Sequence, residues 1–94
     1  METKVLSAIM KLQAAQIMLS NEGIHSTMET HITKYGNIEL TAYTNDESKG
    51  AAACQILDAY TFNGAKFNSD TYHKGEPNEF TSYSLSAFIS DIED

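Results

Sequence analysis

Acidic and tyrosine side chains recur at matching places in two stretches of this chain of 94 residues. Residues 38–44 read Ile-Glu-Leu-Thr-Ala-Tyr-Thr, and residues 78–84 read Asn-Glu-Phe-Thr-Ser-Tyr-Ser. Carboxylates attract cations, and tyrosines are enriched where proteins meet one another. The chemistry that these residue types offer is therefore recognition of a positively charged surface.

The repetition extends upstream of both stretches. Gly23 corresponds to Gly64, and the pair Glu29-Thr30 corresponds to the pair Asp70-Thr71. An internal period of this size indicates one supersecondary unit used twice. We therefore expect a single domain made of two units and a short tail, at about residues 3–44, 47–85 and 86–94.

The first unit is predicted to be a helix followed by two strands. Apolar side chains follow helical spacing over residues 3–20, and Gly23 suits the left-handed position that ends a helix. From Ile24 the apolar period changes to two, which is typical of a strand, and a second such strand covers residues 38–44.

The turn between these two strands is predicted at residues 35–37, because a loop of this length brings their apolar faces together. It would pair Met28 with Thr44 on the inner face. On the outer face it would place Glu29 opposite Tyr43.

The second unit is predicted by its correspondence with the first. Residues 45–48 can cap a helix, and apolar side chains follow at helical spacing. Asn63-Gly64 could equally form a hairpin turn, but the repeat favours Gly64 as the end of the helix. Strands are then expected at 65–72 and from Glu79 to about Leu85, with Phe80 pointing inward.

The predicted fold class is α+β. Two tandem αββ units give a four-stranded, mainly antiparallel sheet with helices on one face and solvent on the other. A short amphipathic helix is expected in the tail. Its end should fray, because Asp91, Glu93 and Asp94 crowd the negative pole of the helix dipole.

The open side of this sheet is the predicted partner-binding surface. Side chains two apart on a strand are about 6.6 Å apart, close to twice the ~3.4 Å charge spacing of a DNA strand, so carboxylate rows could imitate phosphates. The predicted residues are Glu29, Glu39, Tyr43, Asp70, Tyr72, Glu79 and Tyr83 on this face, with Asp91, Glu93 and Asp94 in the tail. The alternative is a solvated face whose acids serve solubility.

Composition limits the classes of partner that the chain can bind. Thirteen acidic residues against six basic ones give a net charge of -7, and every basic residue is a lysine. Without the planar, bidentate fork of arginine, direct binding to nucleic acid or to an anionic membrane is not expected. The favoured partner is a basic protein surface. The single cysteine, Cys54, is consistent with a reducing cytoplasm.

No cofactor or metal is predicted. The glycines occur singly, which excludes a phosphate-cradling loop, and no nucleophile elbow or metal-ligand spacing is present. A pairing of His31 with Glu29 or Glu39 could serve acid–base chemistry, so a small enzyme is an alternative. The apolar stripe of the first helix is broad and could serve either core packing or a dimer contact.

The chain resembles the small acidic inhibitors made by phages and mobile elements. The resemblance lies in its small size, its negative charge, its lack of arginine and its predicted acidic open face. This group includes anti-restriction DNA mimics of the Arn type and anti-CRISPR proteins. The resemblance covers composition and charge, without a diagnostic motif. It implies a non-enzymatic early phage protein that evades host defence in the host cytoplasm, blocking a restriction or CRISPR nuclease by DNA mimicry or directly. Alternatives are an immunity or antitoxin protein neutralising a basic nuclease, and a structural oligomerisation module.

Overall fold

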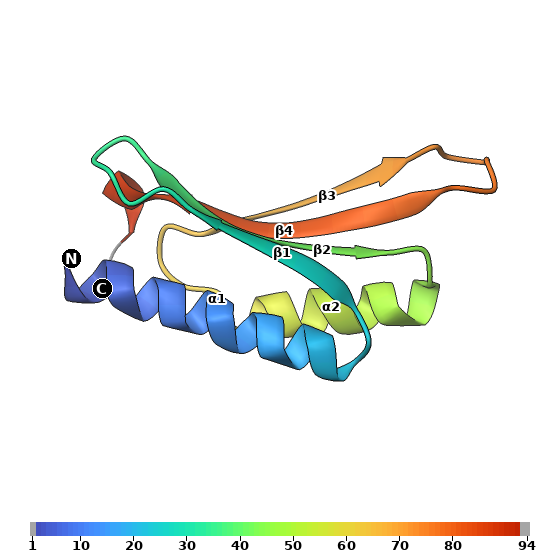
Figure 1. Ribbon diagram of the computed structural model, residues 1–94, viewed down its shortest axis with the longest axis horizontal. Helices are drawn as coiled ribbons and strands as arrows, with labels where there is room; N and C mark the ends of the chain where they lie inside the picture. The colour runs from blue at the N-terminus through green and yellow to red at the C-terminus, as the bar shows by residue number, and fades with distance from the viewer. Residues whose placement is uncertain (1, 93–94) are drawn as a thin grey trace.

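The computed structural model describes residues 2–92, which fold as two helices on one face of a four-stranded antiparallel sheet (Figure 1). In chain order the elements are α1 (Thr3–Asn21), β1 (His25–Thr30), β2 (Asn37–Thr44), α2 (Glu47–Ala59), β3 (Lys66–Tyr72), β4 (Phe80–Phe88) and the 3-10 turn η1 (Ile89–Asp91). The predicted α+β class and the order of two αββ units are confirmed.

Helix α1 forms because small and branched apolar residues recur every three or four positions. The buried members of this stripe are Val5, Ala8, Leu12, Ala15 and Leu19. They face the sheet and form the centre of the core. The helix ends as predicted, because Gly23 adopts a φ of 72° and lets the chain turn into β1.

Helix α2 begins at an aspartate cap. The Asp46 carboxylate accepts hydrogen bonds from the backbone N–H groups of Ser48 and Lys49, at 2.9 and 3.2 Å. Gly50 is buried where α2 crosses the sheet. Gly64, with a φ of 97°, precedes β3 in the place that the repeat predicted, and the alternative hairpin at this position is wrong.

The strands lie in the order β1-β2-β4-β3, so the second strand of each unit is central and the first strand of each unit is an edge. Side chains from the central strands complete the core; these are Ile38, Leu40, Ala42, Leu85 and Ala87. Strand β3 is exposed along its whole length and rises clear of both helices (Figure 1). The core therefore lies under β1, β2 and β4.

The predicted register of the first hairpin is wrong by four residues. Met28 pairs with Leu40, and Glu29 pairs with Glu39. A shift of four keeps every side chain on its predicted face, so the apolar pattern could not reveal the error. The connection is longer than predicted because it closes on itself: Gly36 N–H donates to the Thr33 carbonyl at 3.0 Å.

The predicted orientation of β4 is also wrong. Tyr72 pairs with Phe80, so both side chains lie on the face away from the helices. Tyr83 pairs with Ala42 and faces the helices instead. The connection covers residues 73–79, one residue more than the predicted turn, and a slip of one residue turns every side chain to the other face.

The predicted helical tail is a single 3-10 turn that begins later than expected. Strand β4 continues to Phe88, and only the short turn η1 follows. The side chain of Ile92 is 1% exposed, which anchors the end of the described chain to the core. The predicted fraying concerns Glu93 and Asp94, which lie outside the described residues.

Candidate functional site

The sheet face away from the helices, here called the open face, has no helix over it (Figure 1). Its centre consists of short polar side chains, because successive outward positions carry them on every strand. These are Thr27, Thr41, Asn68, Ser82, Ser84 and Ser86. Short side chains keep this part of the surface low, so the larger groups at its ends stand out from it.

Aromatic rings cross one end of the open face from edge to edge. The rings of His25, Tyr43, Phe80, Tyr72 and His73 form this group, here called the ring row. Its centroid separations are 5.9 Å for His25–Tyr43, 6.3 Å for Tyr43–Phe80, 4.9 Å for Tyr72–Phe80 and 6.2 Å for His73–Phe80. These separations lie within or close to the range of favourable aromatic contacts.

The strand order builds the ring row. Strands β1, β2, β4 and β3 each contribute one ring, and His73 follows β3 directly. Tyr72 and Phe80 are stacked, with 17° between their planes. Ser82 lies between Tyr43 and Asp70 and is only 8% exposed although it belongs to the open face. Its low exposure indicates that the neighbouring side chains pack closely over it.

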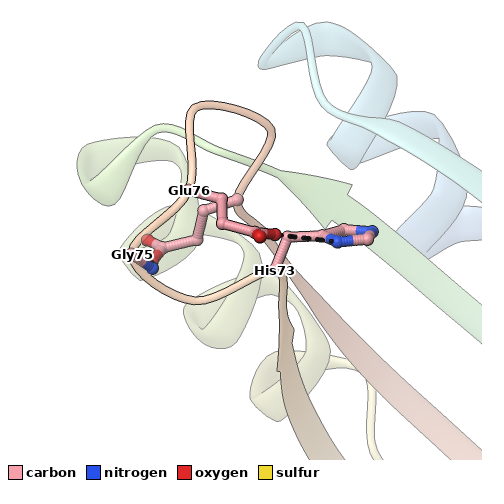
Figure 2. Close-up of polar contacts among 4 residues, drawn as sticks. His73, Gly75 and Glu76 are labelled. Atoms are coloured by element: carbon pink, nitrogen blue, oxygen red, sulfur yellow. Dashed lines mark hydrogen bonds and ion pairs between the residues drawn. The ribbon is translucent and has the colours of Figure 1, made fainter.

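His73 and Glu76 shape the connection beyond the ring row. His73 has a φ of 56°, the only positive φ among described residues other than glycine. Its Nδ1 lies 3.3 Å from Oε2 of Glu76, and Figure 2 shows the carboxylate reaching toward the imidazole. The contact is an ion pair only when the imidazole is protonated. This contact places the Glu76 carboxylate close to the ring of His73.

The predicted acids do not form a phosphate-like row. Glu29 and Glu39 lie directly opposite each other at the end of the open face farther from the rings. Asp70 lies on the far edge strand beside Ser82. Like charges directly opposite each other on neighbouring strands are destabilising.

Glu79 is not on the open face. It lies in the connection before β4, where its carboxylate accepts a hydrogen bond from Gly75 N–H at 2.7 Å. With Asp46, Glu47, Phe80 and other residues it lines a pocket of about 350 Å³ between the start of α2 and the start of β4. The structure thus brings three carboxylates close to Phe80, on the helix side of the ring row.

Some of the other predicted site residues lie on the open face, and others do not. Tyr43, Asp70 and Tyr72 lie on the open face as predicted. Tyr83 faces α2, where it packs against Gly50, so its predicted role at the open face is wrong. Asp91 belongs to η1, at the end of β4 opposite to Phe80. Glu93 and Asp94 lie outside the described residues.

Sequence reasoning missed three members of the ring row. The sequence pattern gives no signal for the rings of His25 and His73, which lie at the start of one predicted strand and just after another, and it predicts that Phe80 points inward. One signal in the sequence does predict the outward orientation of Phe80. Tyr83, Leu85 and Ala87 alternate with serines, so they share the buried face and Phe80 falls on the opposite face.

The acid–base alternative, a pairing of His31 with Glu29 or Glu39, stays a prediction. Within residues 2–92, His31 lies beyond the end of β1, in the connection to β2. Within the same residues, no group of three or more histidine, cysteine or acidic side chains could hold a metal ion.

Helix α1 also keeps apolar side chains on its outer side. Leu6, Met10, Ile17 and Met18 are exposed there. A dimer contact along this stripe therefore stays a prediction. No helix within the described part of the chain has the length and apolar character needed to cross a membrane.

Comparison with known proteins does not assign the chain to a family. No protein-family model matches it, and no curated protein or solved structure shows significant similarity to it.

Proposed function

We propose that this protein is a non-enzymatic interaction protein whose open face binds a basic protein surface. The observation that carries the proposal is the ring row, which crosses all four strands and has Asp70 and Glu76 beside it. In the resembling group of phage and mobile-element inhibitors, such a partner is a nucleic-acid-binding enzyme of host defence. The proposed role is to block that enzyme in the host cytoplasm.

The rings supply affinity for arginine in particular. A guanidinium group can stack on the face of Tyr or Phe and at the same time donate paired hydrogen bonds to a carboxylate. The stacked pair Tyr72 and Phe80 and the neighbouring Asp70 offer both kinds of contact. Nucleic-acid-binding enzymes carry arginines on the surfaces that contact phosphates.

Charge favours the same partner. Carboxylates gather around the ring end of the molecule, from β3, from the connection to β4 and from the start of α2; they are Asp70, Glu76, Glu79, Asp46 and Glu47. The chain as a whole carries a net charge of -7, which speeds encounter with a cationic surface.

Direct blocking fits the geometry better than DNA mimicry. A mimic needs carboxylates at regular, phosphate-like intervals, whereas Glu29 and Glu39 face each other and Asp70 lies apart from them. The large groups nearest the acids are rings, which suit packing against a protein. We therefore propose occlusion of the enzyme's basic groove by the ring end of the sheet.

The test is affinity capture from a lysate of cells that contain restriction and CRISPR nucleases. Wild-type protein is compared with the variant Tyr43→Ala/Phe80→Ala and with the charge variant Glu47→Lys/Glu76→Lys. We expect the wild type to retain a basic nucleic-acid-binding protein that salt and duplex DNA displace. Both variants should bind that protein at least about tenfold more weakly.

Matched control changes lie away from the ring row. Tyr35 is 85% exposed in the connection between β1 and β2, so Tyr35→Ala removes an exposed ring from another place. Glu2→Lys changes charge at the start of α1 by the same amount as each substitution in the charge variant. Equal capture by all variants, or binding indifferent to salt and DNA, would contradict the proposal.

A further inference from the structure

The outer edge of β3 is unpaired within the described chain. Its only strand partner there is β4, and all of its residues are exposed. Figure 1 shows β3 lifted away from both helices. An edge strand presents a row of free backbone N–H and C=O groups, which can form hydrogen bonds with another strand.

An apolar groove lies beside this edge on the helix side of the sheet. It has a volume of about 370 Å³, and its lining residues are Cys54, Leu57, Asp58, Thr61, Phe67 and Leu85. Phe67 pairs with Leu85 and so faces the same side, yet it is 48% exposed. The second unit therefore leaves apolar surface uncovered at its edge strand.

We propose that β3 pairs with β3 of a second copy of this chain, antiparallel and about a two-fold axis through Asn68. The two four-stranded sheets would then form one continuous sheet. Both open faces would lie on the same side of it, because a two-fold axis perpendicular to a sheet keeps each side chain on its own face. The two ring rows would be presented together.

Charge complementarity selects this register. Opposite residues of an antiparallel pair share a face, so a symmetric pairing of β3 centres on a single residue. With Asn68 at the axis, Lys66 of each copy lies opposite Asp70 of the other, which makes two ion pairs on the joined open face. With Ser69 at the axis, Lys66 would instead lie opposite Tyr72.

The apolar side of the strand supports the same register. With Asn68 at the axis, Phe67 lies opposite Ser69 of the other copy. The two Phe67 side chains are then diagonal neighbours at about 7–8 Å, which is within reach of aromatic rings. Each ring would cover apolar surface at the margin of the other copy's groove.

The other edge strand, β1, is less suited to this contact. Met28, on the inner face of β1, packs against the core. The strand begins directly after the buried residue Ile24. No comparable uncovered aromatic side chain lies on its inner side, where Ser26 and Thr30 flank Met28. Net repulsion between two copies is screened beyond about 8 Å at physiological salt, so the contacts at the edge decide the outcome.

Sedimentation equilibrium of the full chain tests the proposal with a charge swap. Within one chain Lys66 pairs with Ser86 and Asp70 with Ser82, so neither change removes an ion pair from the monomer. We expect Lys66→Asp and Asp70→Lys each to raise the dimer dissociation constant about tenfold to a hundredfold, because two attractive pairs become repulsive. The double swap Lys66→Asp/Asp70→Lys should restore the wild-type constant.

Circular dichroism establishes that each variant is folded. A monomer at every concentration, four equal dissociation constants, or a double swap that fails to restore association would each overturn the proposal.

Disulfide trapping tests the axis itself, in a Cys54→Ser background. Asn68→Cys should cross-link two copies faster than Ser69→Cys, because only position 68 lies opposite itself. Thr27→Cys on β1 is the control for the other edge. Faster trapping at position 69 or 27 would overturn the assignment. Self-association is measured without any partner, so it stands or falls separately from the proposed function.

Discussion

Asp46 shows how one exposed carboxylate organises an element. It accepts hydrogen bonds from the Ser48 hydroxyl at 2.7 Å and from the backbone N–H groups of Ser48 and Lys49. These donors favour the ionised form and hold the pKa of Asp46 below its ordinary value, with the Ser48 hydroxyl as the largest cause. The sequence predicted a cap within residues 45–48, since short polar residues precede an apolar helical pattern there.

Replacing this cap should lower stability in a way that depends on pH. Asp46→Ala should lower the melting temperature by a few degrees, whereas Asp46→Asn keeps a neutral oxygen acceptor and should lose less. Because the folded pKa is depressed, the contribution of the charge is present above the unfolded pKa of about 3.9. It is lost as the pH falls through the folded value. Thermal melts should therefore show the gap between wild type and Asp46→Asn closing in acid; a gap that stays constant would contradict this assignment.

The orientation of strand β4 decides which side chains reach the open face. The internal repeat of residues 38–44 at 78–84 predicted Tyr83 outward, but the longer connection at 73–79 reverses this. Local alternation was the better guide, because Leu85 and Ala87 must be buried and Tyr83 shares their face.

Helix α2 provides a direct test of that orientation. A Cβ added at Gly50 would lie 2.5 Å from the Tyr83 hydroxyl oxygen and 3.2 Å from the ring carbon that bears it. Gly-to-Ala changes inside helices normally stabilise by roughly 1 kcal/mol. Here the overlap should outweigh that gain, so Gly50→Ala should lower the free energy of unfolding by about 1 kcal/mol.

Tyr83→Phe removes the closest atom, so it should recover much of the loss in the Gly50→Ala background. Urea denaturation of the two single variants and the double variant measures this coupling. A Gly50→Ala protein more stable than wild type would mean that Tyr83 does not lie against α2.

The hairpin register marks where sequence patterns stop being informative. Pairing Met28 with Leu40 or with Thr44 satisfies the same apolar face, so only the hydrogen bonds within residues 31–36 decide between the two. The helix bounds, by contrast, followed directly from the spacing of Val5, Leu12 and Leu19 and from Gly23.

For the whole molecule, element order and net charge were readable from the sequence, but the candidate site was not. Tyr43 and Tyr72 were predicted on one face, yet their joining through Phe80 depends on the central position of β4 and on the length of its connection. Surfaces that arise from strand order have no signature in local spacing. The same order leaves β3 as an edge beside an uncovered groove.

A titration of isotopically labelled protein with an arginine-rich peptide, followed by amide chemical shifts, tests the central claim most directly. Binding at the ring end predicts the largest shift changes at Tyr43, Tyr72 and Ser82, with weaker effects from a lysine-rich peptide of equal charge, because guanidinium stacks on aromatic rings better than ammonium does. Changes confined to α1, or spread evenly over exposed acids with no difference between the two peptides, would contradict the account.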